Sequence, residues 1–237
     1  MIKTWMTPWL LMAVPFLGAA LSLLLRTSFQ RMKTSALLTT VASMLVVIGT
    51  PWALGDTLAG VPFLCLLPLT AFLSLLGQPL HRDNTSAWTT TLVLLGLGLG
   101  ILTAQAPAHD VMLLILPGLL CILLYRYQSG ATPETWRGLS AYGLSMMSAA
   151  LALLLPTPAS TVALLVTCAT LLPLLPVHSG FIATLTGLPG NLPAFLVFLL
   201  PTVGFHTLLM LLPNLTGTTL HTVAILEIGR ASCRERV

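Results

Sequence analysis

The residues of this chain that could do chemistry are few, and its histidines are the most informative of them. His178 follows two prolines, Pro173 and Pro176, in the stretch LPLLPVHSG at the end of a long apolar run. Histidine is the side chain whose charge changes nearest to neutral pH, which makes it a candidate for binding a proton. His178 therefore either takes part in proton transfer or ends a helix at a membrane surface.

A second candidate pair lies further along the chain. Thr202 and His206 are four residues apart, so a helix would place both on one side. In an apolar segment such side chains either line a water-filled path or hydrogen-bond to a neighbouring helix. Together the candidate proton path consists of His178, Thr202 and His206.

The other reactive groups form no recognisable site. Cys65, Cys121 and Cys168 lie in apolar segments, where cysteine behaves as a small hydrophobic residue, and no CxxC or other metal-ligand spacing occurs. The glycines of LLGLGLGILTA (94–104) follow no predicted strand, so they favour close helix packing rather than phosphate binding. We therefore expect no catalytic centre, no cofactor, no metal site and no nucleic-acid partner.

The composition indicates which elements must hold these residues. The chain has 237 residues, of which 56% are hydrophobic and 7% charged, with a mean hydropathy of +0.97. Soluble domains carry about 25% charged residues. Apolar runs long enough to cross a hydrocarbon core recur throughout. The sequence thus predicts an all-α fold, a polytopic transmembrane helix bundle in a lipid bilayer. Its predicted helices, about nine, are 5–25, 36–54, 60–77, 88–105, 109–126, 138–156, 160–176, 192–212 and 216 onward.

The region near residues 172–192 is predicted to be a broken helix. Pro173 and Pro176 should end or kink the preceding helix, and Pro189 comes shortly before the next one. The segment between them is too short to cross a bilayer and too apolar for a loop in water. Irregular backbone at membrane depth is tolerated only where protein buries it or water lines it. The break is therefore a candidate transport feature.

Basic residues concentrate in the loops on one side of the predicted bundle. These loops follow the first, third and fifth helices and contain Arg26, Arg31, Lys33, Arg82, Arg126 and Arg137. Lys3, Asp56 and Asp110 fall on the other side. Because cytoplasmic loops are rich in Lys and Arg, this asymmetry predicts an N-terminus outside the cell. We expect an integral protein of the bacterial inner (plasma) membrane.

The last eleven residues, EIGRASCRERV (227–237), differ from the rest of the chain. They hold five of its sixteen Lys, Arg, Asp and Glu residues, and the string resembles translated read-through of a sequencing adapter. We expect residues 1–226 to form a single transmembrane domain, the N-terminal part of a longer subunit, and 227–237 to be an artefact. Without the tail, seven basic and four acidic residues give a net charge of +3.

The break resembles the central motif of the antiporter-like subunits of respiratory complex I, a family that includes Mrp-type cation/proton antiporters and subunits of membrane-bound hydrogenases. In that family a proline pair precedes a histidine, a polar helix break follows, and another proline opens the next helix. Pro173, Pro176, His178 and Pro189 match this order without a gap, and Gly204 falls on a family glycine.

The resemblance covers most of residues 50–212. It implies a membrane subunit of an NADH–quinone-oxidoreductase-like or hydrogenase-like complex, which moves protons or Na⁺ beside other membrane subunits and has no redox centre of its own. The sequence also departs from the family. Leu171 and Thr202 stand where the family has lysines, Leu185 replaces a second histidine, and ILPGLL (115–120) replaces the glutamate of the fifth helix.

Three interpretations therefore stay open. The chain is a subunit of a proton-translocating complex, a non-conducting scaffold subunit of such a complex, or an unrelated polytopic transporter or enzyme. A charged residue inside a later broken helix would favour the first interpretation, and no intramembrane charge at all would favour the second. Acidic or metal-binding loops would favour the third.

Overall fold

The computed structural model describes residues 2–54, 61–78, 85–127, 133–157, 159–172 and 179–214, with side chains from residue 8 onward except at 51–54, 61–63, 85, 179 and 214. Over these residues it contains nine α-helices and no strand, which confirms the predicted all-α bundle. The helices are α1 (Ile2–Leu24), α2 (Phe29–Leu54), α3 (Val61–Leu76), α4 (Thr85–Thr103), α5 (Ala108–Tyr127), α6 (Pro133–Leu154), α7 (Ala159–Leu171), α8 (Ser179–Gly187) and α9 (Leu192–Leu211). The helix predicted from residue 216 and the segment 227–237 lie outside the described residues.

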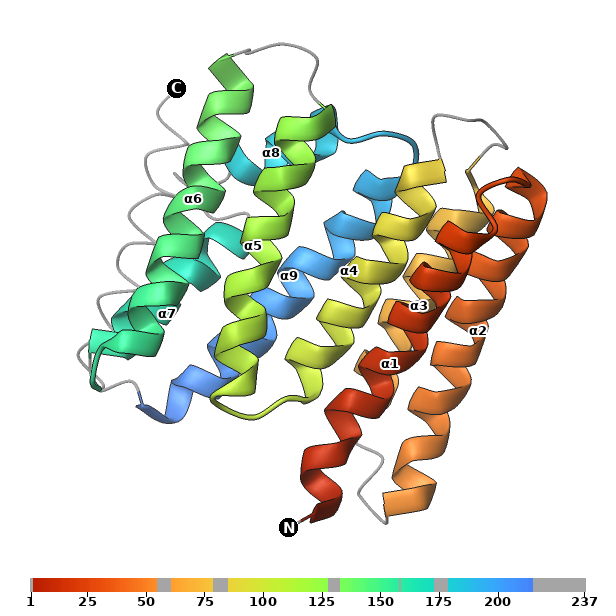
Figure 1. Ribbon diagram of the computed structural model, residues 1–237. Coiled ribbons are helices and arrows are strands. Elements are labelled where there is room, and N and C mark those ends of the chain that lie inside the picture. The colour runs from red at the N-terminus through yellow and green to blue at the C-terminus, as the bar shows by residue number, and fades with distance from the viewer. Residues whose placement is uncertain are drawn as a thin grey trace, which may run out of the picture.

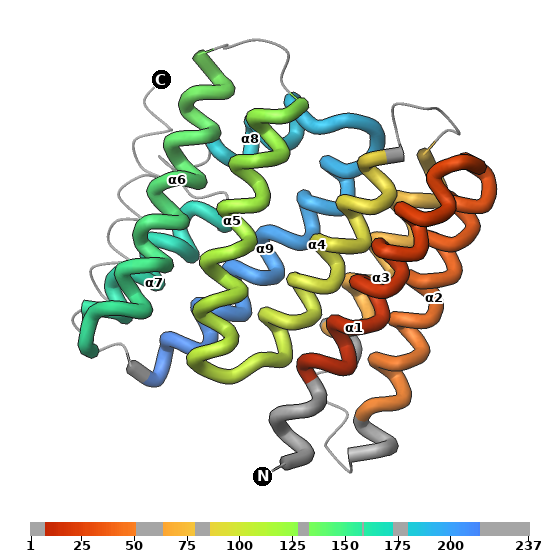
Figure 2. The backbone as a smooth tube through the Cα atoms, viewed as in Figure 1, coloured from red at the N-terminus to blue at the C-terminus, as the bar shows by residue number. Residues whose placement is uncertain are grey.

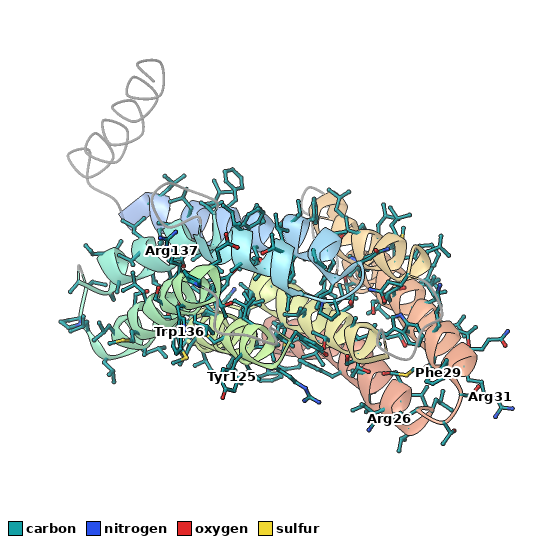
Figure 3. The ribbon with its side chains drawn as sticks, turned by 90° about the horizontal axis from the view of Figure 1, so that it is seen from above. Arg26, Phe29, Arg31, Tyr125, Trp136 and Arg137 are labelled. Atoms are coloured by element: carbon teal, nitrogen blue, oxygen red, sulfur yellow. The ribbon has the colours of Figure 1, made fainter. Side chains whose placement is uncertain are left out.

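The helices form two layers (Figures 1 and 3). One layer contains α1, α4, α5 and α6, the other contains α3, α9 and α7, and α2 packs beside α1 and α3 at one side. Helices α1 to α7 alternate in direction, and α9 crosses obliquely behind α4 and α5 (Figure 2). The central helix is α4, which contacts α1, α2, α3, α5 and α9.

Small residues let neighbouring helices approach α4 closely, as the sequence predicts. A methyl group added at Gly98 would lie 2.5 Å from Leu199 Cδ1 of α9, and one added at Gly100 would lie 2.5 Å from Met12 Sδ of α1. Such close contact between helices is typical of membrane proteins, in which van der Waals packing holds helices together.

Four helical segments in the described part of the chain are long and apolar enough to cross a membrane. They are residues 29–50 of α2, 86–103 of α4, and the whole of α5 and α9. Large apolar side chains such as Leu24, Ile122 and Leu154 are exposed on the outside of the bundle. A surface of this kind suits contact with lipid, where apolar side chains need no cover. The structure is therefore that of a membrane protein.

The described Arg and Lys side chains gather at one end of the bundle, called here the basic end. They are Arg26, Arg31, Lys33, Arg126 and Arg137. Figure 3 looks down on this end, where the exposed aromatic rings of Tyr125 and Trp136 lie on the side of Arg137, and Arg26 and Arg31 lie on the other side. Asp110 lies at the opposite end, because α5 begins where α1 begins. The side chains of Lys3 and Arg82 lie outside the description.

The start of α2 differs from the prediction. The helix begins at Phe29 rather than at residue 36, so Arg31 and Lys33 belong to its first turns and not to a loop. Long cationic side chains can extend a membrane helix in this way, because their charged ends reach the membrane surface. Lys33 Nζ donates to the carbonyl oxygens of Leu76 (3.2 Å) and Gln78 (2.5 Å) at the end of α3. A cation there complements carbonyls that lack a partner within the helix.

The predicted break lies between α7, which ends at Leu171, and α9, which begins at Leu192. Pro173, Pro176 and His178 fall outside the described residues. Sequence analysis expected irregular backbone after them, but Ser179–Gly187 form the short helix α8, packed against α6 and α9. At 1.5 Å per residue α8 is too short to cross a bilayer. The correction has a physical reason, since a helix satisfies its own backbone groups where no water reaches them.

The turn before α9 is fixed to the end of α3. Pro189 and Gly190 lie in this turn, and Gly190 has a φ of 63°. Ser74 Oγ donates to the carbonyl oxygen of Asn191 (2.7 Å), and Asn191 Nδ2 donates to the carbonyl oxygen of Ser74 (3.4 Å). A methyl group added at Gly77 would lie 2.8 Å from Asn191 Nδ2. The start of α9 is thus held against α3.

Candidate functional site

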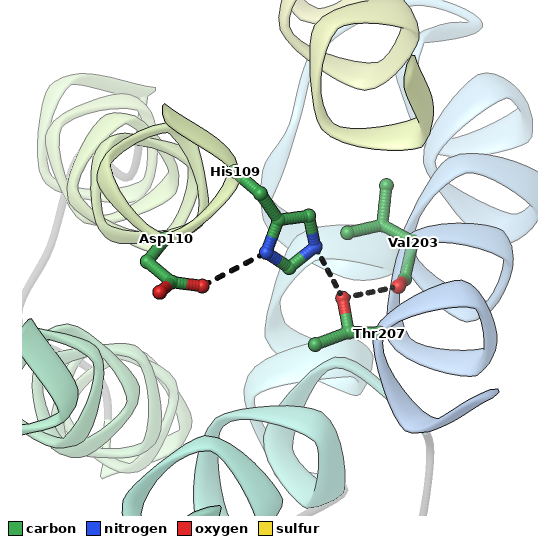
Figure 4. Close-up of polar contacts among 4 residues, drawn as sticks. All are labelled: His109, Asp110, Val203 and Thr207. Atoms are coloured by element: carbon green, nitrogen blue, oxygen red, sulfur yellow. Dashed lines mark hydrogen bonds and ion pairs between the residues drawn. The ribbon is translucent and has the colours of Figure 1, made fainter. Parts of the chain in front are cut away.

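Four polar side chains, His109, Asp110, His206 and Thr207, come together between α5 and α9 and are called here the histidine cluster. His109 Nδ1 lies 2.9 Å from Asp110 Oδ1, and His109 Nε2 lies 3.3 Å from Thr207 Oγ1 (Figure 4). The ring centroids of His109 and His206 are 6.2 Å apart. The cluster sits at the end of the bundle opposite the basic end.

The directions of α5 and α9 explain why these side chains are close together. His109 and Asp110 lie in the first turn of α5, where the helix dipole favours an acidic side chain. The His109 N–H donates to the carbonyl oxygen of Gln105 (3.1 Å), which fixes the start of the helix to the segment before it. Thr207 lies in the last turns of α9. Since α5 begins and α9 ends at the same end of the bundle, these residues face each other.

The members of the cluster differ in exposure. His109 and Thr207 are 3% and 1% exposed, whereas the Asp110 side chain is 19% exposed. A buried imidazole without partners would cost free energy, so its two contacts stabilise it in the apolar interior. The Asp110 carboxylate is therefore accessible to water, whereas the His109 ring bonded to it is buried away from bulk water.

The cluster can hold His109 with one ring proton or with two. With one, the Nδ1–H group donates to Asp110 and Nε2 accepts from the Thr207 hydroxyl. That hydroxyl has a single proton, so it then cannot also donate to the Val203 carbonyl oxygen, which lies 2.9 Å away. With two, both ring N–H groups donate and the Thr207 hydroxyl is free to bond to Val203. Asp110 partners the ring in both states.

His206 connects the cluster to a groove on one face of α9. This α9 groove lies between α3, α4 and α9 and encloses a cavity of about 440 Å³. Thr202 lines the same groove, as its spacing from His206 predicts. The rest of the lining is apolar and includes Leu102 and Pro201, a proline inside α9.

Two of the three predicted path residues, Thr202 and His206, lie in the described part of the chain. His206 is half-buried between the groove and His109, and within the described part of the chain its ring makes no hydrogen bond. The Thr202 hydroxyl donates to the carbonyl oxygen of Phe198 in its own helix (2.7 Å). His178 is outside the described residues, so its proximity to the cluster stays a prediction.

His109, Asp110 and Thr207 were not among the predicted path residues. Consecutive residues on a helix point in different directions, so the pair His109–Asp110 does not suggest a contact. Thr207 is 98 positions from His109 in the chain. One sequence signal could have indicated this site. His109 and Asp110 are two consecutive ionisable residues at the start of a helix of membrane-spanning length, and ionisable residues are rare in membrane segments.

Gly204 brings the end of α7 close to α9. A methyl group added there would lie 2.9 Å from Leu172 Cγ, 3.2 Å from the Leu172 nitrogen and 3.3 Å from Leu171 Cβ. The residue lies one turn before Thr207 on α9. The close approach therefore places the last residues before the break against the helix that carries half of the histidine cluster.

Hydroxyl groups join further helices around the break. Ser148 Oγ of α6 and Thr167 Oγ1 of α7 are 2.8 Å apart, and Thr167 also donates to the Ser145 carbonyl oxygen (3.4 Å). The Ser145 hydroxyl is buried without a hydrogen-bond partner in the described part of the chain. These contacts are of the kind that hold membrane helices together.

Among the described residues no group of three or more His, Cys, Asp or Glu side chains is arranged to hold a metal ion. Comparison with known proteins found no family model, no curated protein and no solved structure that matches this chain.

Proposed function

We propose that the chain is a membrane subunit of a proton-translocating complex of the complex-I-like or hydrogenase-like kind, and that the histidine cluster forms part of its proton path. The observation that carries the proposal is the burial of His109 between Asp110 and Thr207 in a bundle of apolar helices. Ionisable side chains inside membrane proteins are costly and as a rule mark ion pathways.

The path runs from Asp110, which water reaches, to His109 and on to His206. The 6.2 Å between the two rings is too long for a direct hydrogen bond, and one bridging water completes the connection. From His206 the proton enters the α9 groove, where Thr202 offers the next hydroxyl. The protein lies in the bacterial inner membrane with its basic end in the cytoplasm, so Asp110 faces the outside.

The interruption between α7 and α9 supports the family assignment within this proposal. Its prolines, His178 and Gly204 follow the order of the antiporter-like subunits, and transporters commonly place their ion sites beside discontinuous helices. Other subunits of the complex supply the redox chemistry, and other membrane subunits supply the remaining charged positions.

A specific observation favours the non-conducting scaffold as the second candidate. Every Lys, Arg, Asp and Glu of the described helices lies near a helix end, and none lies at mid-membrane depth. Leu171, Leu185 and Thr202 stand where the antiporter-like family has ionisable groups. A scaffold needs only close helix packing of the kind seen around α4.

The test is proton uptake by the assembled complex in liposomes, followed with a trapped pH-sensitive dye. We expect His109→Gln and His206→Gln each to lower the rate about 100-fold or more, the lower end of the effect of a positioned proton-transfer group. The matched control is Thr91→Val, which removes a buried threonine hydroxyl of α4 that bonds only within its own helix. His178→Ala tests the break in the same assay. Normal uptake in all three histidine variants would contradict the proposal and support the scaffold.

A further inference from the structure

The hairpin of α1 and α2 has a groove on its surface that no part of the proposed proton path uses. It encloses about 530 Å³ and runs from Leu25 and Arg31 at the basic end to Val14 and Ala42 deeper in the bundle. From residue 31 to residue 42 its length is roughly 16 Å, at 1.5 Å per helical residue. We call it the hairpin groove.

The hairpin groove is polar at one end and apolar along most of its length. Its apolar walls are Val14, Leu17, Leu21, Leu25, Leu38 and Ala42. The two helices touch at its floor, where a methyl group on Gly18 would overlap the Thr39 side chain. At the basic end the lining changes to Arg31, Thr34 and Ser35. A long apolar channel with a cation at its mouth fits an amphiphile and is unsuited to a soluble anion.

Two groups at the polar end lack partners. Ser35 is 8% exposed, and its hydroxyl makes no hydrogen bond within the described part of the chain. A buried hydroxyl without a partner costs free energy, so in native proteins it normally has an explanation. Arg31 is exposed, and no described carboxylate lies within ion-pair distance of it. The two residues are four apart on α2 and therefore share one face.

The charged side chains of the α1–α2 hairpin are all basic. At the basic end the α1–α2 hairpin carries Arg26, Arg31 and Lys33 and no Asp or Glu. Arg31 also lies at the same end of the bundle as the exposed rings of Tyr125 and Trp136, the residue types that collect at the level of lipid headgroups (Figure 3). The mouth of the groove is therefore at the depth where lipid phosphates lie.

We propose that the hairpin groove binds an anionic phospholipid. Its phosphate accepts hydrogen bonds from the Arg31 guanidinium and the Ser35 hydroxyl, and one acyl chain lies along the apolar walls between α1 and α2. Basic pockets between membrane helices on the cytoplasmic side bind anionic headgroups in this way. The site is independent of the proton path, because it lies on other helices.

The experiment uses native mass spectrometry of the delipidated full chain in detergent, mixed with equal amounts of phosphatidylglycerol and phosphatidylcholine. We expect phosphatidylglycerol to be retained in preference. Arg31→Gln should lower its occupancy about tenfold, which corresponds to one strong charged hydrogen bond. Arg126→Gln is the matched control, since Arg126 is exposed at the same end but lies on α5, away from the groove.

Two further variants separate lipid binding from folding. Ser35→Ala removes a hydroxyl that has no partner among the described residues, so it should lower phosphatidylglycerol occupancy while leaving the delipidated protein at least as stable. Ala42→Trp should fill the deep end of the groove and lower retention of both lipids. Equal retention of the two lipids by the native chain would overturn the proposal, and so would equal losses in Arg31→Gln and Arg126→Gln.

Discussion

Thr207 of α9 lies 3.3 Å from the Nε2 atom of His109 in α5, and this contact joins the two helices through a buried polar group. The same hydroxyl lies 2.9 Å from the carbonyl oxygen of Val203. It therefore lies between two possible acceptors, the His109 ring nitrogen and a backbone carbonyl oxygen, and its single proton can be donated to only one of them at a time.

Thr207→Val should destabilise the bundle by about 1–2 kcal/mol, because it leaves a buried ring nitrogen without its partner. Thr207→Ser keeps the hydroxyl, so it should lower the stability of the bundle by less than Thr207→Val does. Unfolding by SDS, followed by circular dichroism, measures the difference. Thr91→Val is the control, since Thr91 is equally buried and bonds only to its own helix. Equal losses at the two positions would show that the contact with His109 contributes nothing.

Lys33→Met should destabilise the protein by about 1 kcal/mol, since it removes the cation that caps the end of α3 and keeps most of the apolar stem. Lys33→Arg should recover part of the loss, because a guanidinium also donates to carbonyl oxygens. The SDS unfolding midpoint is again the measurement. Arg126→Met is the comparison at the same end of the bundle, and an identical shift there would indicate a general charge effect.

Gly190→Ala should cost about 1–2 kcal/mol, because a φ of 63° is strained for a residue with a Cβ atom. Gly143→Ala is the matched control with the opposite expected sign. Gly143 lies inside α6, and an added methyl group meets nothing within 4 Å, so alanine should stabilise the helix by up to about 1 kcal/mol. Chemical or thermal unfolding measures the change in stability of both variants. A neutral Gly190→Ala would contradict the left-handed turn before α9.

Gly204→Val should loosen the contact between the end of α7 and α9, at a cost of about 1–3 kcal/mol for overpacking. The added side chain would meet Leu172 and Leu171, which lie just before the break. Disulfide trapping between cysteines at Leu172 and Gly204 in a cysteine-free chain measures the approach directly. Slow or absent trapping would contradict the close packing.

Single cysteines should report the orientation of the bundle in the membrane. In a cysteine-free background, Arg26→Cys and Trp136→Cys should react with an impermeant maleimide from the cytoplasmic side, since both residues are exposed at the basic end. Gln105→Cys, exposed at the opposite end, should react from the outside. The reverse pattern would contradict the positive-inside assignment and would place Asp110 in the cytoplasm.

The sequence predicted the helices well because each apolar run is long and is bounded by charges or turn residues. It placed eight of the nine described helices, with errors mainly at their ends. The start of α2 was wrong because Arg31 and Lys33 were taken as loop residues, although their flexible stems allow a helix to continue to the membrane surface. The helix α8 was missed because a nine-residue apolar stretch between prolines has no clear helical period.

The histidine cluster could not be predicted from spacing. The i, i+4 relation correctly placed Thr202 and His206 in one groove, because that relation depends on helix geometry alone. The contact of His109 with Thr207 depends on how α9 crosses α5 after the break, and no local pattern encodes that crossing. The Ser74–Asn191 contact, which fixes the start of α9, is hidden from sequence analysis for the same reason.

The two anchors of α9 restrict how this helix can move. Asn191 holds its start to α3, and Thr207 holds its end to α5. Between them Pro201 removes one hydrogen bond from the helix interior, and it faces the α9 groove. With both ends held and one hydrogen bond missing in between, we expect any bending of α9 to occur at Pro201 rather than by a tilt of the whole helix. Such a bend would change the width of the groove beside His206 while both anchors stay in place.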